Sequence, residues 1–167
     1  MKTKLIELPI VTSNGRFIAR YSGKGLAELN FPDAKAPVGP KRSEGGPVTQ
    51  KIKSWHRATE SALEKVLSGS KPKALPPMDW TGATEFQKSV WRQLLKISGG
   101  RTKSYGEIAE AIGKPKAVRA VGGACGANPI PVLVPCHRVL AANKKLGGFS
   151  GGLDWKRQLL ATEGIKF

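Results

Sequence analysis

The spacing of apolar residues changes part-way along this chain, and the change limits the folds that it can adopt. Residues 5–31 hold short apolar or alternating runs, separated at residues 13–15 and 22–25 by Gly-containing breaks of the hairpin type. In residues 48–67 the apolar side chains instead recur at spacings of three and four, which is typical of one face of a helix. We therefore expect a small β region followed by a helix.

Residues 68–77 are rich in Pro, Ser and Lys and are typical of a linker, as residues 32–47 are of a loop. We expect a domain boundary near residue 78. Residues 1–78 then form a small α/β domain with its linker, and residues 79–167 form a second domain. The fold class that follows is mixed α/β.

The second half is predicted to be mostly helical. Two capping boxes, Thr84 with Gln87 and Ser104 with Glu107, mark helix starts. The first of these helices is expected to place Leu95 on its apolar face and to end at residues 98–100. The helix from Ser104 is followed by a short turn and a third helix from about residue 116, which is the spacing of a helix-turn-helix unit.

The third predicted helix is unusually poor in side chains, since residues 122–127 are only Gly, Ala and Cys. Such a surface lets the backbone come close to a partner. Tight packing against a neighbouring helix is the alternative explanation. Many ordinary helical hairpins also share the helix-turn-helix spacing. The sequence pattern alone therefore does not decide between a DNA-binding helix and a helix packed against its neighbour.

The charge is strongly unbalanced, because 28 Lys and Arg residues against 12 Asp and Glu residues give a net charge of +16. A polyanion, either nucleic acid or an anionic membrane, is the favoured partner, and a basic surface that only aids solubility is the alternative. No stretch approaches the length of a membrane-spanning helix. With only two cysteines, we expect no disulfide framework and a reducing, intracellular (cytoplasmic) location.

A thiol and an imidazole are neighbours at Cys136 and His137, directly after an apolar run at residues 130–134. A thiol becomes a good nucleophile when it loses its proton, and an adjacent imidazole is a common means of removing it. His56 stands alone and is interpreted as structural. Neither cysteine has a second ligand at zinc-finger spacing, so we expect no metal and no cofactor.

Six segments, in this order and spacing, resemble the O6-alkylguanine-DNA alkyltransferases, also called methylated-DNA–protein-cysteine methyltransferases. They are SYGEIA at 104–109, RAVGG at 119–123, NPIP at 128–131, PCHRV at 135–139, GGFSGGL at 147–153 and LLATEG at 159–164. The resemblance is strong over about residues 79–165. It implies a ribonuclease-H-like N-terminal α/β domain, matched only in outline, and a helical domain with a winged-helix-like helix-turn-helix.

The resemblance implies DNA repair by direct reversal. The alkyl group of O6-alkylguanine in double-stranded DNA would pass irreversibly to Cys136, one group per protein, after the base is flipped out. His137 and Glu163 would form a relay to the thiol through water, although from the residues alone Glu163 is better explained as solvated. Tyr105 would assist the leaving guanine, and Asn128 would tie the recognition helix to the Cys136 segment.

The resemblance also assigns the DNA contacts and the pocket. Arg119 matches the finger that fills the vacated place in the base stack, and Tyr105 also crowds the 3′ phosphate. Small residues would let the recognition helix enter the minor groove: Ala117, Ala120, Gly122 and Gly123. The alkylguanine pocket would be formed by Val139, Phe149, Ser150 and Gly151.

Two departures from the family pattern stand out. Some members bind zinc through an N-terminal cysteine, but this chain has no cysteine before Cys125, so no such zinc is expected. Phe149 lacks the phenol hydroxyl that some members carry. Cys125 has no adjacent His and is interpreted as a packing residue.

Three other functions are weighed against this one. Alkyltransferase-like proteins bind lesions but replace the acceptor cysteine, which this chain keeps as Cys136. A redox-sensitive helix-turn-helix regulator would need an effector or dimerisation segment that is not evident, and a cysteine hydrolase rarely has its Cys and His as sequence neighbours. We expect a monomer on DNA, and the residues leave open both cooperative binding and O4-alkylthymine as a second substrate.

Overall fold

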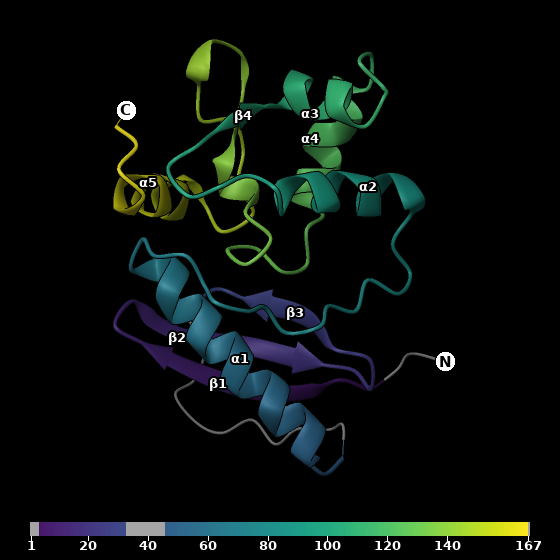
Figure 1. The fold of residues 1–167 in the computed structure, drawn as a ribbon, viewed down its shortest axis with the longest axis vertical. Helices are drawn as coiled ribbons and strands as arrows, with labels where there is room; N and C mark the ends of the chain where they lie inside the picture. The colour runs from purple at the N-terminus through teal and green to yellow at the C-terminus, as the bar shows by residue number, and fades with distance from the viewer. Residues whose placement is uncertain (1–3, 33–45, 167) are drawn as a thin grey trace.

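The computed structural model describes residues 4–32 and 46–166 and shows two layers, a small sheet with one helix and a group of helices above it (Figure 1). Strands β1 (Ile6–Thr12), β2 (Gly15–Tyr21) and β3 (Leu26–Asn30) form an antiparallel sheet in the order β1-β2-β3. The mixed α/β class and the strand–turn–strand pattern expected for residues 5–31 are confirmed. The predicted loop at residues 32–47 lies almost wholly outside the described residues.

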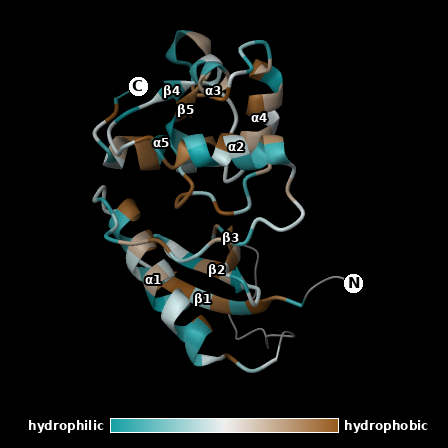
Figure 2. Ribbon diagram, turned by 45° about the vertical axis from the view of Figure 1, so that its right-hand side comes forward, coloured by the Kyte–Doolittle hydropathy of each residue, from teal (hydrophilic) through white to brown (hydrophobic). Residues whose placement is uncertain are grey.

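Helix α1 (Gln50–Leu67) covers one face of this sheet, as its period predicts. Its N-terminus is capped by the Thr49 side chain, which accepts a hydrogen bond from the backbone N–H of Ile52. The strands carry hydrophobic residues and the helix alternates hydrophobic and hydrophilic ones (Figure 2). The buried hydrophobic residues of the sheet and of α1 include Ile10, Phe17 and Leu63.

The chain then forms a parallel bridge with the start of β3 before it enters the second half. The backbone N–H of Leu26 donates to the carbonyl of Pro77, and the N–H of Asp79 donates to the carbonyl of Leu26, both at 2.8 Å. The buried core continues from the sheet into the helices above it. The boundary at residue 78, like the ribonuclease-H-like and winged-helix-like descriptions, stays a prediction.

Residues 79–166, the described part of the second half, contain four helices, two short strands and two 3-10 turns. They are α2 (Glu85–Leu94), β4 (Lys103–Ser104), α3 (Tyr105–Ala111), α4 (Val118–Gly126), η1 (Cys136–Arg138), β5 (Val139–Leu140), η2 (Ala142–Lys144) and α5 (Leu153–Thr162). Both predicted capping boxes are present, with the side chain and the backbone of each pair bonded reciprocally. The parallel pairing of β4 with β5 was not predicted.

One detail of the predicted α2 is wrong. The helix ends at Leu94, short of the glycines at residues 99 and 100, and Leu95 is its C-cap. Leu95 is 38% exposed and does not belong to the buried face. The chain turns at this point, so the periodicity that includes Leu95 no longer describes a helix face.

Candidate active site

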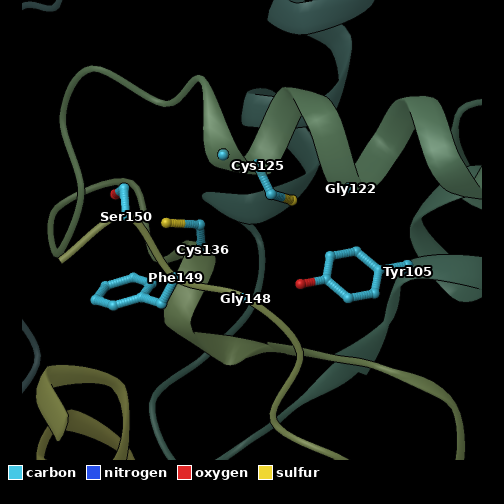
Figure 3. A pocket seen from close by; sticks show the side chains of 8 residues that line it. Tyr105, Gly122, Cys125, Cys136, Gly148, Phe149 and Ser150 are labelled. Carbon is cyan, nitrogen blue, oxygen red and sulfur yellow. The ribbon is translucent and has the colours of Figure 1, made fainter. Parts of the chain in front are cut away.

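A cavity of about 310 Å³ opens between helix α4 and the loop that precedes α5 (Figure 3). It is lined by Tyr105, Gly122, Cys125, Gly126, Cys136, Gly148, Phe149 and Ser150. In the view of Figure 3, the Cys136 sulfur points toward the side of Ser150 and Phe149, while Tyr105 lies across the cavity. The cavity therefore has a thiol on one wall and a phenol on the opposite one.

Asn128 connects the end of α4 to the segment that carries Cys136. Its Nδ2 donates to the carbonyl of Val134 at 2.9 Å, and its Oδ1 accepts from the N–H of Ile130 at 3.0 Å. Asn128 and the apolar segment at residues 130–134 are buried. Cys136 follows this fixed segment in η1 and is only 4% exposed, so the thiol has a defined place.

The imidazole of His137 faces away from solvent and is bonded to Glu163. Its Nε2 lies 3.0 Å from Oε1 of Glu163, and the two side chains are 0% and 3% exposed. An ionised carboxylate can only accept hydrogen bonds, so Nε2 must carry the proton. The other ring nitrogen, Nδ1, is then unprotonated, and it is buried with no hydrogen-bond partner among the described residues.

Arg138 holds the same carboxylate from a second side and was missed by the sequence reasoning. Its Nη2 donates to Oε1 of Glu163 at 2.6 Å, and its Nη1 donates to the carbonyl of Ile97 at 2.6 Å. Burial alone would raise the pKa of Glu163, but the hydrogen bonds and charges of His137 and Arg138 outweigh it and lower that pKa to about 2. The carboxylate is therefore charged across the physiological range.

Burial sets the protonation states of the other two groups. It raises the pKa of Cys136, against the opposing influence of Asn128 and Lys156. It lowers the pKa of His137, which the contact with Glu163 only partly offsets. At rest the thiol is protonated and the imidazole is neutral, which is the pairing that a base needs before it takes a proton.

Helix α4 presents the residues predicted to meet DNA. Arg119, Ala120 and Gly123 are exposed, while Ala117 and Gly122 are half-buried. A Cβ atom built on Gly122 or Gly123 would meet no atom of the described residues within 4 Å. Gly122 and Gly123 are therefore not explained by tight packing against a neighbouring helix. Ala124 and Cys125 are buried instead, and Nε1 of Trp91 in α2 donates to the carbonyl of Ala124 at 2.8 Å, so packing does explain that part of the run.

Comparisons with known proteins agree on one family. Residues 85–165 match the family described as "6-O-methylguanine DNA methyltransferase, DNA binding domain". The chain is 37% identical to the methylated-DNA–protein-cysteine methyltransferase of Haemophilus influenzae, over 92% of this chain and 83% of the relative. It is 41% identical to the protein of that name from Methanosarcina barkeri, over 95% and 94%. This chain belongs to the methylated-DNA–protein-cysteine methyltransferase family.

Solved structures agree with this family membership. The crystal structure of Mycobacterium tuberculosis OGT in complex with DNA superposes with a TM-score of 0.70 at 36% identity, covering 93% of this chain and 90% of that one. The O6-methylguanine-DNA methyltransferase from Pyrococcus kodakaraensis superposes with a TM-score of 0.62 at 24% identity, covering 96% and 99%. The second likeness concerns the fold alone.

Lys156 is a second residue near the cavity that the sequence reasoning missed. The side chain is fully buried, and its Nζ donates to the carbonyls of Val139 at 2.8 Å, Gly148 at 3.2 Å and Leu146. It thus fixes the loop that forms one wall of the cavity. The sequence feature that could have identified Lys156 is its position three residues before Leu159, which places it on the buried face of α5.

Two of the predicted pocket residues lie behind the cavity wall. Val139 is fully buried and contributes its carbonyl to Lys156. Gly151 backs onto the ring of Phe31 from the first half of the chain. Neither residue is among those that line the cavity, whereas Phe149 and Ser150 are.

The remaining candidates have structural surroundings. Cys125 lines the cavity but has no histidine next to it, and burial raises its pKa to about 12, which disfavours the thiolate. His56 lies on α1, where Nδ1 is 2.8 Å from the hydroxyl of Tyr21 and Nε2 is 3.2 Å from the carbonyl of Pro9. In the part of the chain that the structure describes, no cluster of three possible metal ligands occurs and no helix is long and apolar enough to cross a membrane.

Proposed function

We propose that this chain repairs DNA by transferring the alkyl group of O6-alkylguanine in duplex DNA to Cys136, irreversibly and once per molecule. The observation that carries the proposal is the state of the His137 imidazole, which follows the cavity-lining Cys136 in the sequence. Its Nε2 is bonded to Glu163, and its unprotonated Nδ1 is buried with no hydrogen-bond partner among the residues that the structure describes. The cavity lies against α4, the exposed second helix of the helix-turn-helix unit.

The first step is removal of the thiol proton. A water molecule relays the proton of Cys136 to Nδ1 of His137, and the imidazolium that forms is stabilised by the charged Glu163. Arg138 keeps that carboxylate ionised and in place. Cys136 is therefore a thiol at rest and becomes a thiolate only when the reaction takes place.

In the second step the thiolate attacks the alkyl carbon in line with the bond to O6. The S–C bond forms as the C–O bond breaks, and the electron pair passes to the guanine. Tyr105 donates its hydroxyl proton to the guanine ring, so that guanine leaves as a neutral base, and the tyrosinate regains a proton from solvent. Burial raises the pKa of Tyr105, which keeps its hydroxyl protonated for this role.

DNA is the partner that the charge and the exposed helix support. The +16 net charge favours a polyanion, and a Mycobacterium tuberculosis relative is described in complex with DNA. A base inside a duplex is out of reach of the cavity, so flipping is required at a cost of a few kcal/mol. Arg119, exposed on α4, takes the place of the extruded base, and the open surface at Gly122 and Gly123 lets the helix approach the minor groove.

Mass spectrometry after incubation with a duplex containing O6-methylguanine tests the proposal. We expect one added methyl group per protein, on the peptide that contains Cys136, and no reaction in Cys136→Ala, which still binds the duplex. Cys125→Ala is the matched control and should react as the unaltered protein does. Binding of the lesion without loss of the methyl group would instead indicate a lesion-binding protein, and a methyl group on Cys125 would overturn the assignment.

A further inference from the structure

Four aromatic side chains join the sheet to the wall of the cavity. Phe17 and Phe31 come from the sheet region, Trp155 from α5, and Phe149 from the loop that lines the cavity. Phe31 is central to the group, since its ring centroid lies 5.6 Å from Phe17, 5.6 Å from Phe149 and 5.0 Å from Trp155. Edge and tilted contacts at these distances are favourable for aromatic pairs.

The contact between Phe31 and Phe149 is edge-to-face, with the ring planes at 75°. Phe149 and Tyr105 are the aromatic residues that line the cavity, and in Figure 3 Phe149 lies on the side toward which the Cys136 sulfur points. A group held next to that sulfur therefore has the Phe149 ring as a neighbour. A residue that fixes the position of the Phe149 ring therefore also fixes the space available beside the Cys136 sulfur.

Gly151 makes the close approach of Phe31 possible. A Cβ atom at this position would lie 2.5 Å from Cε2 and 2.7 Å from Cδ2 of the Phe31 ring. The ring thus rests on the loop backbone at Gly151 as well as on the face or edge of its aromatic neighbours. The ring also contacts Phe17, which is fully buried in β2.

The same part of the sheet also contacts the opposite segment of the site. The backbone N–H of Leu29 in β3 donates to the carbonyl of Pro129 at 2.9 Å. Pro129 directly follows Asn128, which holds the segment leading to Cys136. The end of β3 therefore touches both the acceptor segment and the loop that faces it.

We propose that Phe31 is a positioning residue that sets the alkyl-group size accepted at Cys136, by holding Phe149 in the cavity wall. The inference rests on the proposed function and extends it to a residue of the first half of the chain. Without the Phe31 ring, Phe149 can move outward and the space beside the sulfur widens. The transfer rate of bulky alkyl groups then rises relative to that of methyl.

The test compares single-turnover rates for two duplexes, one with O6-methylguanine and one with O6-benzylguanine. Phe31→Ala should raise the benzyl-to-methyl rate ratio about tenfold, the scale on which pocket contacts discriminate groups of different size. Leu63→Ala, which removes a fully buried side chain from α1, is the matched control for lost stability and should leave the ratio unchanged. An unchanged ratio in Phe31→Ala would overturn the proposal.

A double-variant cycle separates positioning from a general effect. If Phe31 acts through Phe149, adding Phe31→Ala to Phe149→Ala should leave the ratio where Phe149→Ala alone puts it. If Phe31→Ala changes the rate ratio as much in the Phe149→Ala protein as in the unaltered one, Phe31 does not act through Phe149.

A second readout does not depend on repair. The rates at which methyl and benzyl methanethiosulfonate modify Cys136, followed by peptide mass mapping, should show the same rise in the benzyl-to-methyl ratio for Phe31→Ala. If the unaltered protein removes neither alkyl group from DNA, the proposed function fails, while this ratio still decides the role of Phe31.

Discussion

The Nε2 atom of His137 lies 3.0 Å from a carboxylate oxygen of Glu163, and both side chains are almost completely excluded from solvent. The contact fixes the tautomer of the imidazole, because the carboxylate can accept but not donate. It therefore decides which ring nitrogen is available to take a proton.

Glu163→Gln should slow alkyl transfer about 100-fold, a typical share of general-base catalysis. The amide oxygen can still accept from Nε2, so the tautomer is kept, but the negative charge that stabilises the imidazolium is lost. Single-turnover kinetics with an O6-methylguanine duplex measures the effect. Glu85→Gln, at an exposed position in the first turn of α2, is the control, and an undiminished rate in Glu163→Gln would show that the carboxylate only anchors Arg138.

The same carboxylate makes stability depend on pH. Its pKa falls from 4.5 to about 2 on folding, so its contribution, about 3 kcal/mol, is fully present above pH 4.5 and is lost as the pH falls toward 2. Folding also lowers the pKa of buried His137 from its ordinary value of 6.5, so this group likewise makes the protein less stable as the pH falls below 6.5. Both groups bind more protons in the unfolded chain at acidic pH.

Urea unfolding at a series of pH values checks this dependence. The advantage of the unaltered protein over Glu163→Gln should shrink by about 2 kcal/mol between pH 6 and pH 3. Glu85→Gln should follow the unaltered protein throughout. Parallel curves for the unaltered protein and Glu163→Gln would mean that the Glu163 carboxylate is not held in its charged form by folding.

Lys156→Met should loosen the cavity wall and make the Cys136 thiol less acidic. The change leaves the carbonyls of Val139, Leu146 and Gly148 without their donor, at a cost of about 2 kcal/mol. It also removes a positive charge that lowers the pKa of Cys136. The pH profile for alkylation of Cys136 by iodoacetamide should shift upward, while Arg157→Met, at an exposed neighbouring position, should leave it in place.

Local signals in the sequence predicted most of the secondary structure. The hairpin break before Gly15 and the two capping boxes depend on residues within three positions of one another, so they are readable without tertiary information. Leu95 was misplaced because an apolar period continues past a helix end without changing. The short parallel pair of β4 and β5 joins residues 36 positions apart and has no local signal.

The candidate site was predictable to different degrees for different residues. Cys136 and His137 are marked by their adjacency, whereas the residue pattern alone favoured a solvated Glu163, which the structure buries against Arg138. Arg138 donates to residues far away in sequence, so its partners could not be inferred from spacing. Val132 adopts a φ of +74° although it is β-branched, a conformation that local preference disfavours and burial of the segment imposes.

Arg119→Ala should separate base flipping from chemistry. Arg119 is exposed on α4, so the free energy of unfolding should change by less than about 0.5 kcal/mol. Transfer from an O6-methylguanine duplex should slow about 30-fold, which corresponds to about 2 kcal/mol of lost support for the flipped state. Transfer from the free base O6-benzylguanine, which needs no flipping, should proceed at the unaltered rate.

Arg57→Ala is the matched control for the loss of one positive charge, because Arg57 is exposed on α1, in the layer that carries the sheet. It should lower duplex repair only through the general attraction of DNA, and added salt should erase this difference. The slower transfer by Arg119→Ala should persist at saturating duplex concentration. Arg119 stabilises the flipped base, whereas a saturating concentration corrects only for weaker DNA binding. Equal losses with the duplex and the free base would place Arg119 in the organisation of the cavity instead of in flipping.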